Sequence, residues 1–345
     1  MSERTAWVDT AKGIGIILMV YGHVARGVER AGITIDRPVF AVVDSVIYSF
    51  HMPLFFFLSG LFFVASMEKR GVAGTVSNKL VTLAYPYVVW SLIQGLVEVA
   101  LSGYSNGHVD LVAVLAIWQP RAQFWFLYAL FFVSLLATLV YRLVGPCWYS
   151  AVVVVAGLAY VFADILPGGL PLVFLKQEFV FFALGVSFEA MSCDQTGKGA
   201  ISSVVLIAAF LIGQWLFHGP MGQLATDAPR WSALALAMVS ILAVATACRR
   251  FGQRAGLLAS IGRDSLAIYV MHVIAGSGAR IVLQKLLGIE SAFVHLVAGT
   301  TIGVVLPLLA LWTMRRIGIE FLLSPPWLGS ARKHARTADS LSGTG

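Results

Sequence analysis

Residues 40–66 read FAVVDSVIYSFHMPLFFFLSGLFFVAS, an apolar stretch interrupted by a single acidic residue and a single histidine. A helix needs about 20 mostly apolar residues to cross the roughly 30 Å hydrocarbon core of a bilayer. The stretch is long enough, and its apolar residues do not alternate with polar ones as they do in the strands of a membrane barrel. It therefore predicts a transmembrane helix.

The whole chain has the same character. Of its 345 residues, 59% are hydrophobic and 12% are charged, whereas about 25% of the residues of a typical soluble domain are charged. So few charges cannot build a water-soluble surface. We expect an all-α integral membrane protein of about ten transmembrane helices, at residues 12–28, 40–66, 80–101, 124–143, 148–164, 171–190, 200–218, 230–247, 257–283 and 291–313.

The basic residues indicate an orientation. The formal net charge is +7, but the lysines and arginines stand between the expected helices and form no single patch, which argues against a nucleic-acid partner. If the N-terminus is cytoplasmic and ten helices alternate in direction, 16 of the lysines and arginines lie on the inner side and 8 on the outer side. The positive-inside rule then predicts that both termini are cytoplasmic. The expected location is the cytoplasmic (inner) membrane, with the lipid bilayer as a partner.

One domain accounts for most of the chain. We expect a membrane domain over residues 1–320 and a disordered cytoplasmic tail over residues 321–345, because the tail is rich in Ser, Gly, Thr, Lys and Arg and has little apolar surface to bury. The three cysteines (Cys147, Cys193 and Cys248) show no paired spacing, so neither a disulfide framework nor a metal site is expected. The oligomeric state is left open.

Ionisable residues inside the expected helices are the candidate functional groups, because each is costly in hydrocarbon unless it is paired or hydrated. Lys12 and His23 are eleven residues apart, which places them within about 20° of one helix face and about 16 Å apart along the axis. From the spacing alone, a functional role for His23 and a packing hydrogen bond are equal alternatives. For Lys12 the spacing favours a side chain that extends to the membrane surface.

The second expected helix carries Asp44, Tyr48 and His51 at steps of four and three, on one face. Asp44 and His51 are about 10 Å apart along the axis, too far for a hydrogen bond within the helix. We expect this face to line a polar cavity against the first helix. Pro53 frees a backbone carbonyl one turn back and permits a kink beside His51.

The remaining candidates are weaker. Glu178 could be a carboxylate of an acceptor site, although a structural partner for Lys or Arg is an equal alternative. A single histidine in an apolar helix, such as His272, more often makes a packing hydrogen bond. We expect no functional role for the loop and tail histidines His108, His218, His295 and His334.

Several segments together resemble the acyltransferase-3 family of membrane acyltransferases, in particular its short, fucose-4-O-acetylase-like members. The opening WVDTAKGI (residues 7–14) leads to Tyr21-Gly22-His23, with ten residues between Lys12 and His23. Residues 50–62, FHMPLFFFLSGLF, resemble the most characteristic stretch of the family. Weaker similarities follow in the same order: Tyr85-Pro86-Tyr87 with Trp90, Phe124-Trp125-Phe126-Leu127, and Ser265-Leu266-x-Ile268-Tyr269-x-x-His272.

The resemblance implies transfer of an acyl group, usually acetyl, from cytoplasmic acyl-CoA to a hydroxyl of a glycan or lipid-linked sugar. Acetyl-CoA would be a donor substrate, and no permanently bound cofactor or metal is implied. His23 occupies the presumed catalytic position. Where the family often has several arginines before its Tyr-Pro pair, this chain has only Lys79, so arginines of a later inner loop are candidates to hold the CoA phosphates. The expected donor-binding residues are Lys12, Lys79, Arg249 and Arg250, and the expected substrate-binding residues are Asp44, Tyr48, Trp125 and Glu178.

The resulting hypothesis makes His23 the general base, with His51 as a second catalytic residue that orients His23 or the substrate or donates to the developing oxyanion. A covalent acyl-histidine route stays open. A different class of function is a proton-coupled multi-pass transporter of a glycan or small metabolite, in which the two histidines and Asp44 relay protons. A membrane scaffold with purely structural polar groups is a third alternative.

Overall fold

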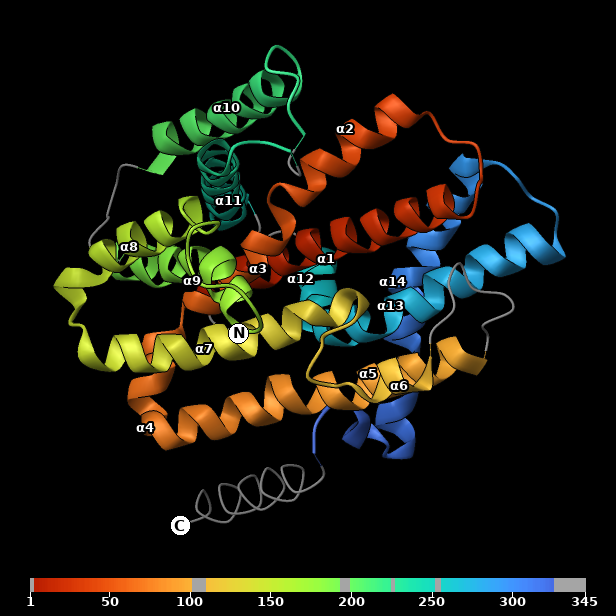
Figure 1. The fold of residues 1–345 in the computed structure, drawn as a ribbon, viewed down its shortest axis with the longest axis horizontal. Helices are drawn as coiled ribbons and strands as arrows, with labels where there is room; N and C mark the ends of the chain where they lie inside the picture. Colours follow the sequence, from red (N-terminus) through yellow and green to blue (C-terminus); the bar gives the residue numbers. More distant parts are fainter. Residues whose placement is uncertain (1–2, 101–109, 193–198, 225–226, 252–255, 326–345) are drawn as a thin grey trace.

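The computed structural model describes residues 3–100, 110–192, 199–224, 227–251 and 256–325. In these ranges the chain is helical and contains no strand (Figure 1). The α-helices are α1 (Glu3–Arg30), α2 (Arg37–Tyr48), α3 (His51–Gly60), α4 (Phe63–Lys79), α5 (Tyr85–Ala100), α6 (Leu111–Leu115), α7 (Trp125–Leu143), α8 (Tyr149–Val161), α9 (Leu172–Ser192), α10 (Gly199–His218), α11 (Arg230–Phe251), α12 (Gly256–Arg263), α13 (Ser265–Ile281) and α14 (Ala292–Ile317).

Each segment expected to cross the membrane overlaps one or more helices of the described chain. Within the described residues, seven helical segments are long and apolar enough to span a bilayer, and two shorter apolar helices, Pro146–Val161 and Val204–His218, accompany them. The all-α membrane character is thus confirmed, while the count of ten spans and the side of each terminus stay predictions. The seven are Ala6–Arg30, Arg37–Gly60, Phe63–Ala100, Ala122–Leu143, Arg230–Phe251, Ser265–Leu286 and Ala292–Ile317.

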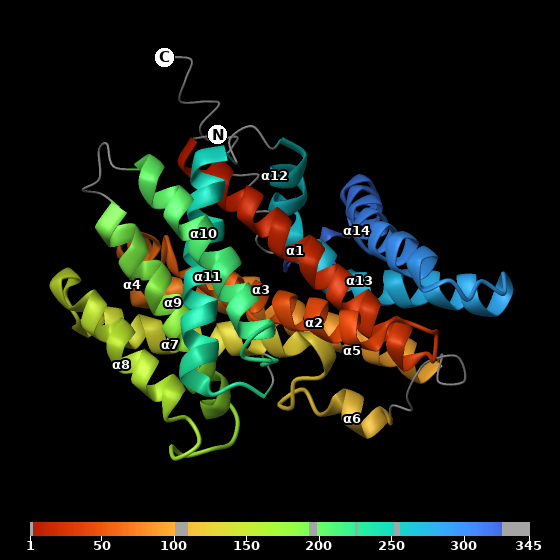
Figure 2. The same ribbon diagram turned by 90° about the horizontal axis from the view of Figure 1, so that it is seen from above.

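Helix α1 forms the centre of the bundle and contacts α3, α11, α12, α13 and α14 (Figures 1 and 2). Its N-terminal half touches α12 backbone to backbone. A Cβ atom at Gly13 would lie 2.1 Å from the carbonyl oxygen of Leu258, and one at Gly262 would lie 1.8 Å from that of Asp9. Only glycine fits at these two positions, because hydrogen is the only side chain that leaves room for the facing carbonyl.

The second apolar stretch is a broken helix. Helix α2 ends at Tyr48 and α3 begins at His51, with Phe50 at φ −143° and ψ −21° between them. Pro53 has no N–H to donate to the carbonyl of Ser49 four residues earlier, so a continuous helix would lose a hydrogen bond at this point. The kink expected beside His51 is therefore present, and it makes His51 the first residue of α3.

The chain beyond α14 is fastened to α5. Residues 320–322 form a single 3₁₀ turn, whose carbonyl of Phe321 accepts a 2.6 Å hydrogen bond from the Tyr85 hydroxyl. The carbonyl of Leu322 accepts one of 2.8 Å from the Trp90 indole N–H. Residues 321–325 of the expected tail are among the described residues, and two of them lie in this turn. The rest of the expected tail, residues 326–345, lies outside the described residues, and the domain boundary stays a prediction.

Candidate active site

Helices α1 and α13 bring two histidines into contact. The ring of His23 meets the ring of His272 edge-on, with centroids 5.0 Å apart and planes at 61°. The close approach is possible because Gly276 of α13 faces Val24 of α1, where an added Cβ would be 3.2 Å from the valine side chain. His272 is 1% exposed, whereas His23 is only partly buried. His23 is therefore the more accessible of the two imidazoles.

The tautomer of His272 is fixed by the backbone of its own helix. Its Nδ1 lies 2.8 Å from the carbonyl oxygen of Tyr269 and 3.2 Å from that of Ile268. A carbonyl can only accept, so Nδ1 carries the proton and donates it. The neutral ring then has its lone pair on Nε2, which is buried and has no hydrogen-bond partner among the described residues.

His51 is held in the same way at the helix break. Its Nδ1 donates to the carbonyl oxygen of Ile47 at 2.8 Å, while the backbone N–H of Phe50 reaches that carbonyl only at 3.3 Å. The imidazole thus replaces part of the helical hydrogen bonding lost at the break. Its Nε2 is buried and also lacks a partner within the described chain. His51 and His272 both present an unprotonated Nε2.

Tyr48 connects α2 to α1. Its ring contacts His51 edge-on, with centroids 4.6 Å apart, and the Arg26 guanidinium lies 3.3 Å above the ring centroid. Gly22 leaves room for the ring, because a Cβ there would be 2.9 Å from it. Arg26 also pairs with Asp44 through two hydrogen bonds of 2.7 and 2.8 Å. Asp44 and Tyr48 thus face the first helix, and the partner of Asp44 is Arg26 rather than a histidine.

His23, His51 and His272 form what we call the histidine cluster. His51 lies against Tyr48, whose ring packs on Gly22, the residue before His23, and both His272 and His51 are electrostatic neighbours of His23. The sequence-based interpretation assigned His272 to packing. The signal that could have identified it was the position of His272 in the third of the weaker family-like segments.

Two of the expected donor-binding residues lie near the N-terminal end of α1. Lys12 forms an ion pair of 3.8 Å with Asp9, one turn earlier on the same helix. Arg249, in the last turn of α11, lies with its guanidinium 5.6 Å from the ring centroid of Trp7 and 5.3 Å from that of Phe188. Two basic side chains therefore lie near this end of α1, and one of them is paired with Asp9.

The other expected donor-binding residues have aromatic contacts elsewhere. The Arg250 guanidinium lies 5.6 Å from the ring of Phe251, its sequence neighbour. The Lys79 ammonium, at the end of α4, lies 5.6 Å from the ring of Phe63. None of these contacts connects Arg250 or Lys79 to Lys12, so their expected role stays a prediction.

Trp125 and Glu178 lie apart from the histidines. Trp125 stacks on Phe174 with centroids 5.7 Å apart and planes at 19°. One carboxylate oxygen of Glu178 is buried without a partner in the described chain, and its electrostatic neighbour is Tyr160 of α8. Neither residue contacts the histidine cluster in the part of the chain that the structure describes. Their expected role in substrate binding stays a prediction.

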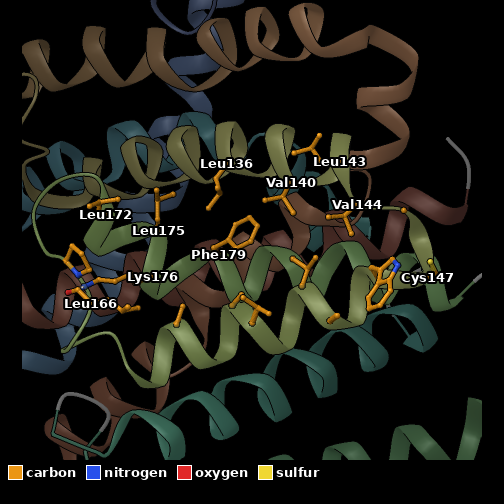
Figure 3. Close-up of a pocket in the computed structure, with 18 residues that line it drawn as sticks. Leu136, Val140, Leu143, Val144, Cys147, Leu166, Leu172, Leu175, Lys176 and Phe179 are labelled. Atoms are coloured by element: carbon orange, nitrogen blue, oxygen red, sulfur yellow. The ribbon is translucent and has the colours of Figure 1, made fainter.

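The large cavity of the molecule is also separate from the histidines. A groove of about 970 Å³ runs between α7, α8 and α9, with Lys176 at one end and Cys147 at the other (Figure 3). Its lining is almost entirely apolar. Lys176 donates hydrogen bonds to the carbonyls of Ala163 and Leu166, at 2.6 and 3.1 Å. No member of the histidine cluster lines the groove.

Comparison with known proteins identifies the family of this chain. The model of the acyltransferase-3 family, described as an acyltransferase domain, matches residues 5–312. The chain belongs to this family. The match runs from the first turns of α1 into the last turns of α14 and so includes all three histidines.

Curated relatives of this acyltransferase-3 chain are two nodulation proteins NolL. The protein of Sinorhizobium fredii is 28% identical over 193 residues, which are 54% of this chain and 49% of the relative. The protein of Mesorhizobium japonicum is 27% identical over 217 residues, which are 61% of this chain and 56% of the relative. The chain thus spans about half the length of the curated relatives it matches. No solved structure matches the chain at a significant level.

Proposed function

We propose that the protein is a membrane acyltransferase that moves an acetyl group from cytoplasmic acetyl-CoA to a hydroxyl of a glycan or lipid-linked sugar. The observation that carries the proposal is the histidine cluster at the centre of the bundle, in which one partly buried imidazole lies beside two buried imidazoles of fixed tautomer. Membership of the acyltransferase-3 family supports the class of reaction.

His23 acts as the general base. The acceptor oxygen attacks the thioester carbonyl and passes its proton to the imidazole, a C–O bond forms, and the C–S bond breaks as the tetrahedral intermediate collapses. The departing CoA thiolate takes the proton from the imidazolium, which restores neutral His23. An imidazole suits both steps because it can hold or release a proton near neutral pH, and such a base contributes about 10²–10⁴-fold to the rate.

His51 and His272 accept hydrogen bonds. Both rings already donate from Nδ1 to backbone carbonyls, so only the lone pair of Nε2 is available. A neutral ring in this tautomer can receive a hydrogen bond from the acceptor hydroxyl or from a ring N–H of His23. It cannot donate to an oxyanion. Of the roles considered for His51, orientation of His23 or the acceptor therefore has the stronger support.

The donor approaches from the N-terminal end of α1. Lys12 and Arg249 supply positive charge there, as binding of CoA phosphates requires. Lys12 is about 16 Å from His23 along the helix axis, which leaves room for an extended donor whose thioester reaches the cluster. Positively charged ends are expected on the cytoplasmic side.

The proposal is tested by transfer of labelled acetyl from acetyl-CoA in membranes that contain wild type, His23→Gln or His51→Gln. His218→Gln is the matched control, because His218 bonds Ser45 at 2.8 Å, outside the cluster. We expect losses of about a hundredfold or more in the two cluster variants and full activity in the control. Full activity in both cluster variants contradicts the proposal. Solute movement by reconstituted protein without consumption of acetyl-CoA would instead identify a transporter.

A further inference from the structure

Arg280 is a buried cation with no paired anion among the described residues. Its side chain is 7% exposed, and its hydrogen-bond partner is the side-chain oxygen of Gln284, at 3.2 Å from Nη1. Among the residues that the structure describes, no acid forms an ion pair with it. A buried charge is costly unless it is paired, so Arg280 is a position where a ligand of opposite charge would be stabilised.

A second cation lies on the adjoining turn of α1. Gln284 donates from Nε2 to the carbonyl of Ala31 at 3.5 Å, which joins Arg280 to the turn that holds Arg30. Arg30 is exposed, and in the described chain neither it nor its neighbour Glu29 forms an ion pair. The two arginines thus lie on the two helices that also carry His23 and His272.

Helix α14 places a buried histidine nitrogen, Nδ1 of His295, near Arg280 along the helix axis. Helices α13 and α14 run antiparallel, because Gly303 faces the carbonyl of His272 and Gly276 faces that of Gly299. Continuing this register by one turn places His295 opposite Arg280. His295 is 1% exposed, and its Nε2 bonds the carbonyl of Ile289 at 2.8 Å. Its Nδ1 has no partner among the described residues.

This region lies on the far side of the histidine cluster from Lys12. Arg30 is seven residues beyond His23, and Arg280 is eight residues beyond His272 on a parallel helix, or about 10–12 Å along each axis. The donor-binding cations and these arginines therefore flank the cluster from opposite ends of α1. If the CoA phosphates occupy one end, the other end is available to the acceptor.

We propose that Arg280 and Arg30 form a subsite for a phosphate or diphosphate group carried by the acceptor, about two helical turns from the hydroxyl that is acetylated. The proposal rests on the proposed acetyl transfer. Arginine suits the ligand, because its planar guanidinium donates paired hydrogen bonds to phosphate oxygens. Because the arginines lie about two helical turns from the histidine cluster, the phosphate and the reacting hydroxyl must lie at opposite ends of the bound sugar portion.

The first test measures binding without turnover. Purified protein in nanodiscs of zwitterionic lipid is saturated with CoA, so that the donor site is filled, and its thermal midpoint is followed as pyrophosphate is added. We expect a concentration-dependent rise in wild type that is absent in Arg280→Gln and Arg30→Gln and retained in Lys285→Gln, which removes a nearby cation outside the subsite. No response in wild type, or an equal response in all variants, overturns the proposal.

The second test identifies the source of the phosphate. Acetyl transfer is measured with a polyprenyl-diphosphate-linked saccharide and with the same saccharide free of lipid and phosphate. We expect each arginine variant to raise KM about tenfold to a hundredfold for the phosphorylated acceptor, with kcat and use of the neutral acceptor unchanged. Equal use of both acceptors by wild type and variants contradicts an acceptor phosphate. If nanodiscs of anionic phospholipid abolish the pyrophosphate response as well, the subsite holds a lipid headgroup instead.

The two proposals can fail separately. If wild type acetylates neither saccharide, the proposed function fails, while the thermal response to pyrophosphate still decides whether the subsite exists. If Arg280→Gln does not fold, Arg30→Gln carries the test, because Arg30 is exposed and its replacement removes no buried contact.

Discussion

At the scale of single residues, the backbone sets the protonation pattern of the site. His51 and His272 come from different helices, yet each donates Nδ1–H to a carbonyl three or four residues earlier on its own chain. Each therefore has a lone pair on Nε2 that finds no partner in the part of the chain that the structure describes. Two buried acceptors without donors are costly in a purely structural core, so they are more simply explained as acceptors for a substrate or for His23.

This pattern predicts a separation of folding from activity. In His51→Asn and His272→Asn the amide N–H₂ can still donate to the backbone carbonyl, but nothing replaces Nε2. We expect each variant to keep a thermal midpoint close to that of wild type and to lose transfer activity by about a hundredfold. The measurements are kcat and the midpoint on the same preparations. Unchanged kcat with a lowered midpoint would show that the rings serve packing.

Sequence reasoning went furthest for residues close together in the sequence, although the helix expected over them breaks between Tyr48 and His51. The spacing of Asp44, Tyr48 and His51 predicts one face turned toward the first helix, and Tyr48 does lie against Gly22. It could not predict that Asp44 binds Arg26, because that pair depends on the rotation of α1 relative to α2. It also could not place His272 beside His23, since periodicity assigns a residue to a face of its own helix and not to a neighbour far along the chain.

At the scale of helices, the break between α2 and α3 positions His51. The break lies where Pro53 removes a donor, and there the Ile47 carbonyl accepts the Nδ1–H bond that fixes the imidazole. Pro307 in α14 also lacks an N–H donor, yet it lies inside a helix that continues on both sides. The surrounding packing, and not proline alone, decides whether a helix bends or divides.

Pro53→Ala is therefore expected to act on the site through the backbone. The substitution restores an N–H that can bond the Ser49 carbonyl, so it favours a continuous helix and turns His51 away from its present position. We expect kcat to fall about tenfold or more while the thermal midpoint stays equal or rises. Pro307→Ala is the matched control and should leave kcat unchanged. Full activity of Pro53→Ala would show that the break is not needed to place His51.

The contact between α1 and α12 predicts a loss of stability. Gly13→Val would place a Cβ only 2.1 Å from the carbonyl oxygen of Leu258, so the two helices must separate. Overpacking of this kind costs about 1–3 kcal/mol, occasionally more. Gly27→Ala on the same helix meets nothing within 4 Å and should be neutral or slightly stabilising. Equal thermal midpoints for the two variants would contradict the close contact.

At the scale of the whole molecule, composition predicts more than it does for a soluble protein. Hydrocarbon requires that every backbone group be satisfied within a helix, so each long apolar segment had few alternatives to helix. Composition predicts the length of each helix less well. Helix α8 has 13 residues and is about 20 Å long, which is short for a membrane core of roughly 30 Å. Which helices adjoin is not encoded by hydropathy, so α1 could not be recognised as the centre.

The orientation in the membrane can be measured with a native cysteine. Cys147 is exposed and lies on the side that the distribution of basic residues predicts to be cytoplasmic. In a Cys193→Ser, Cys248→Ser background, a membrane-impermeant maleimide should label Cys147 only after cells are permeabilised. Labelling of intact cells would reverse the orientation, and with it the side from which acetyl-CoA reaches Lys12.

The groove between α7, α8 and α9 has an almost entirely apolar lining (Figure 3). Because a bilayer leaves no empty space of about 970 Å³ beside an apolar wall, we expect lipid tails to fill this groove. Solubilisation exchanges those tails for detergent. The shape and length of the detergent chain will then decide how well α8 stays packed, and added native lipid should restore what extraction removes.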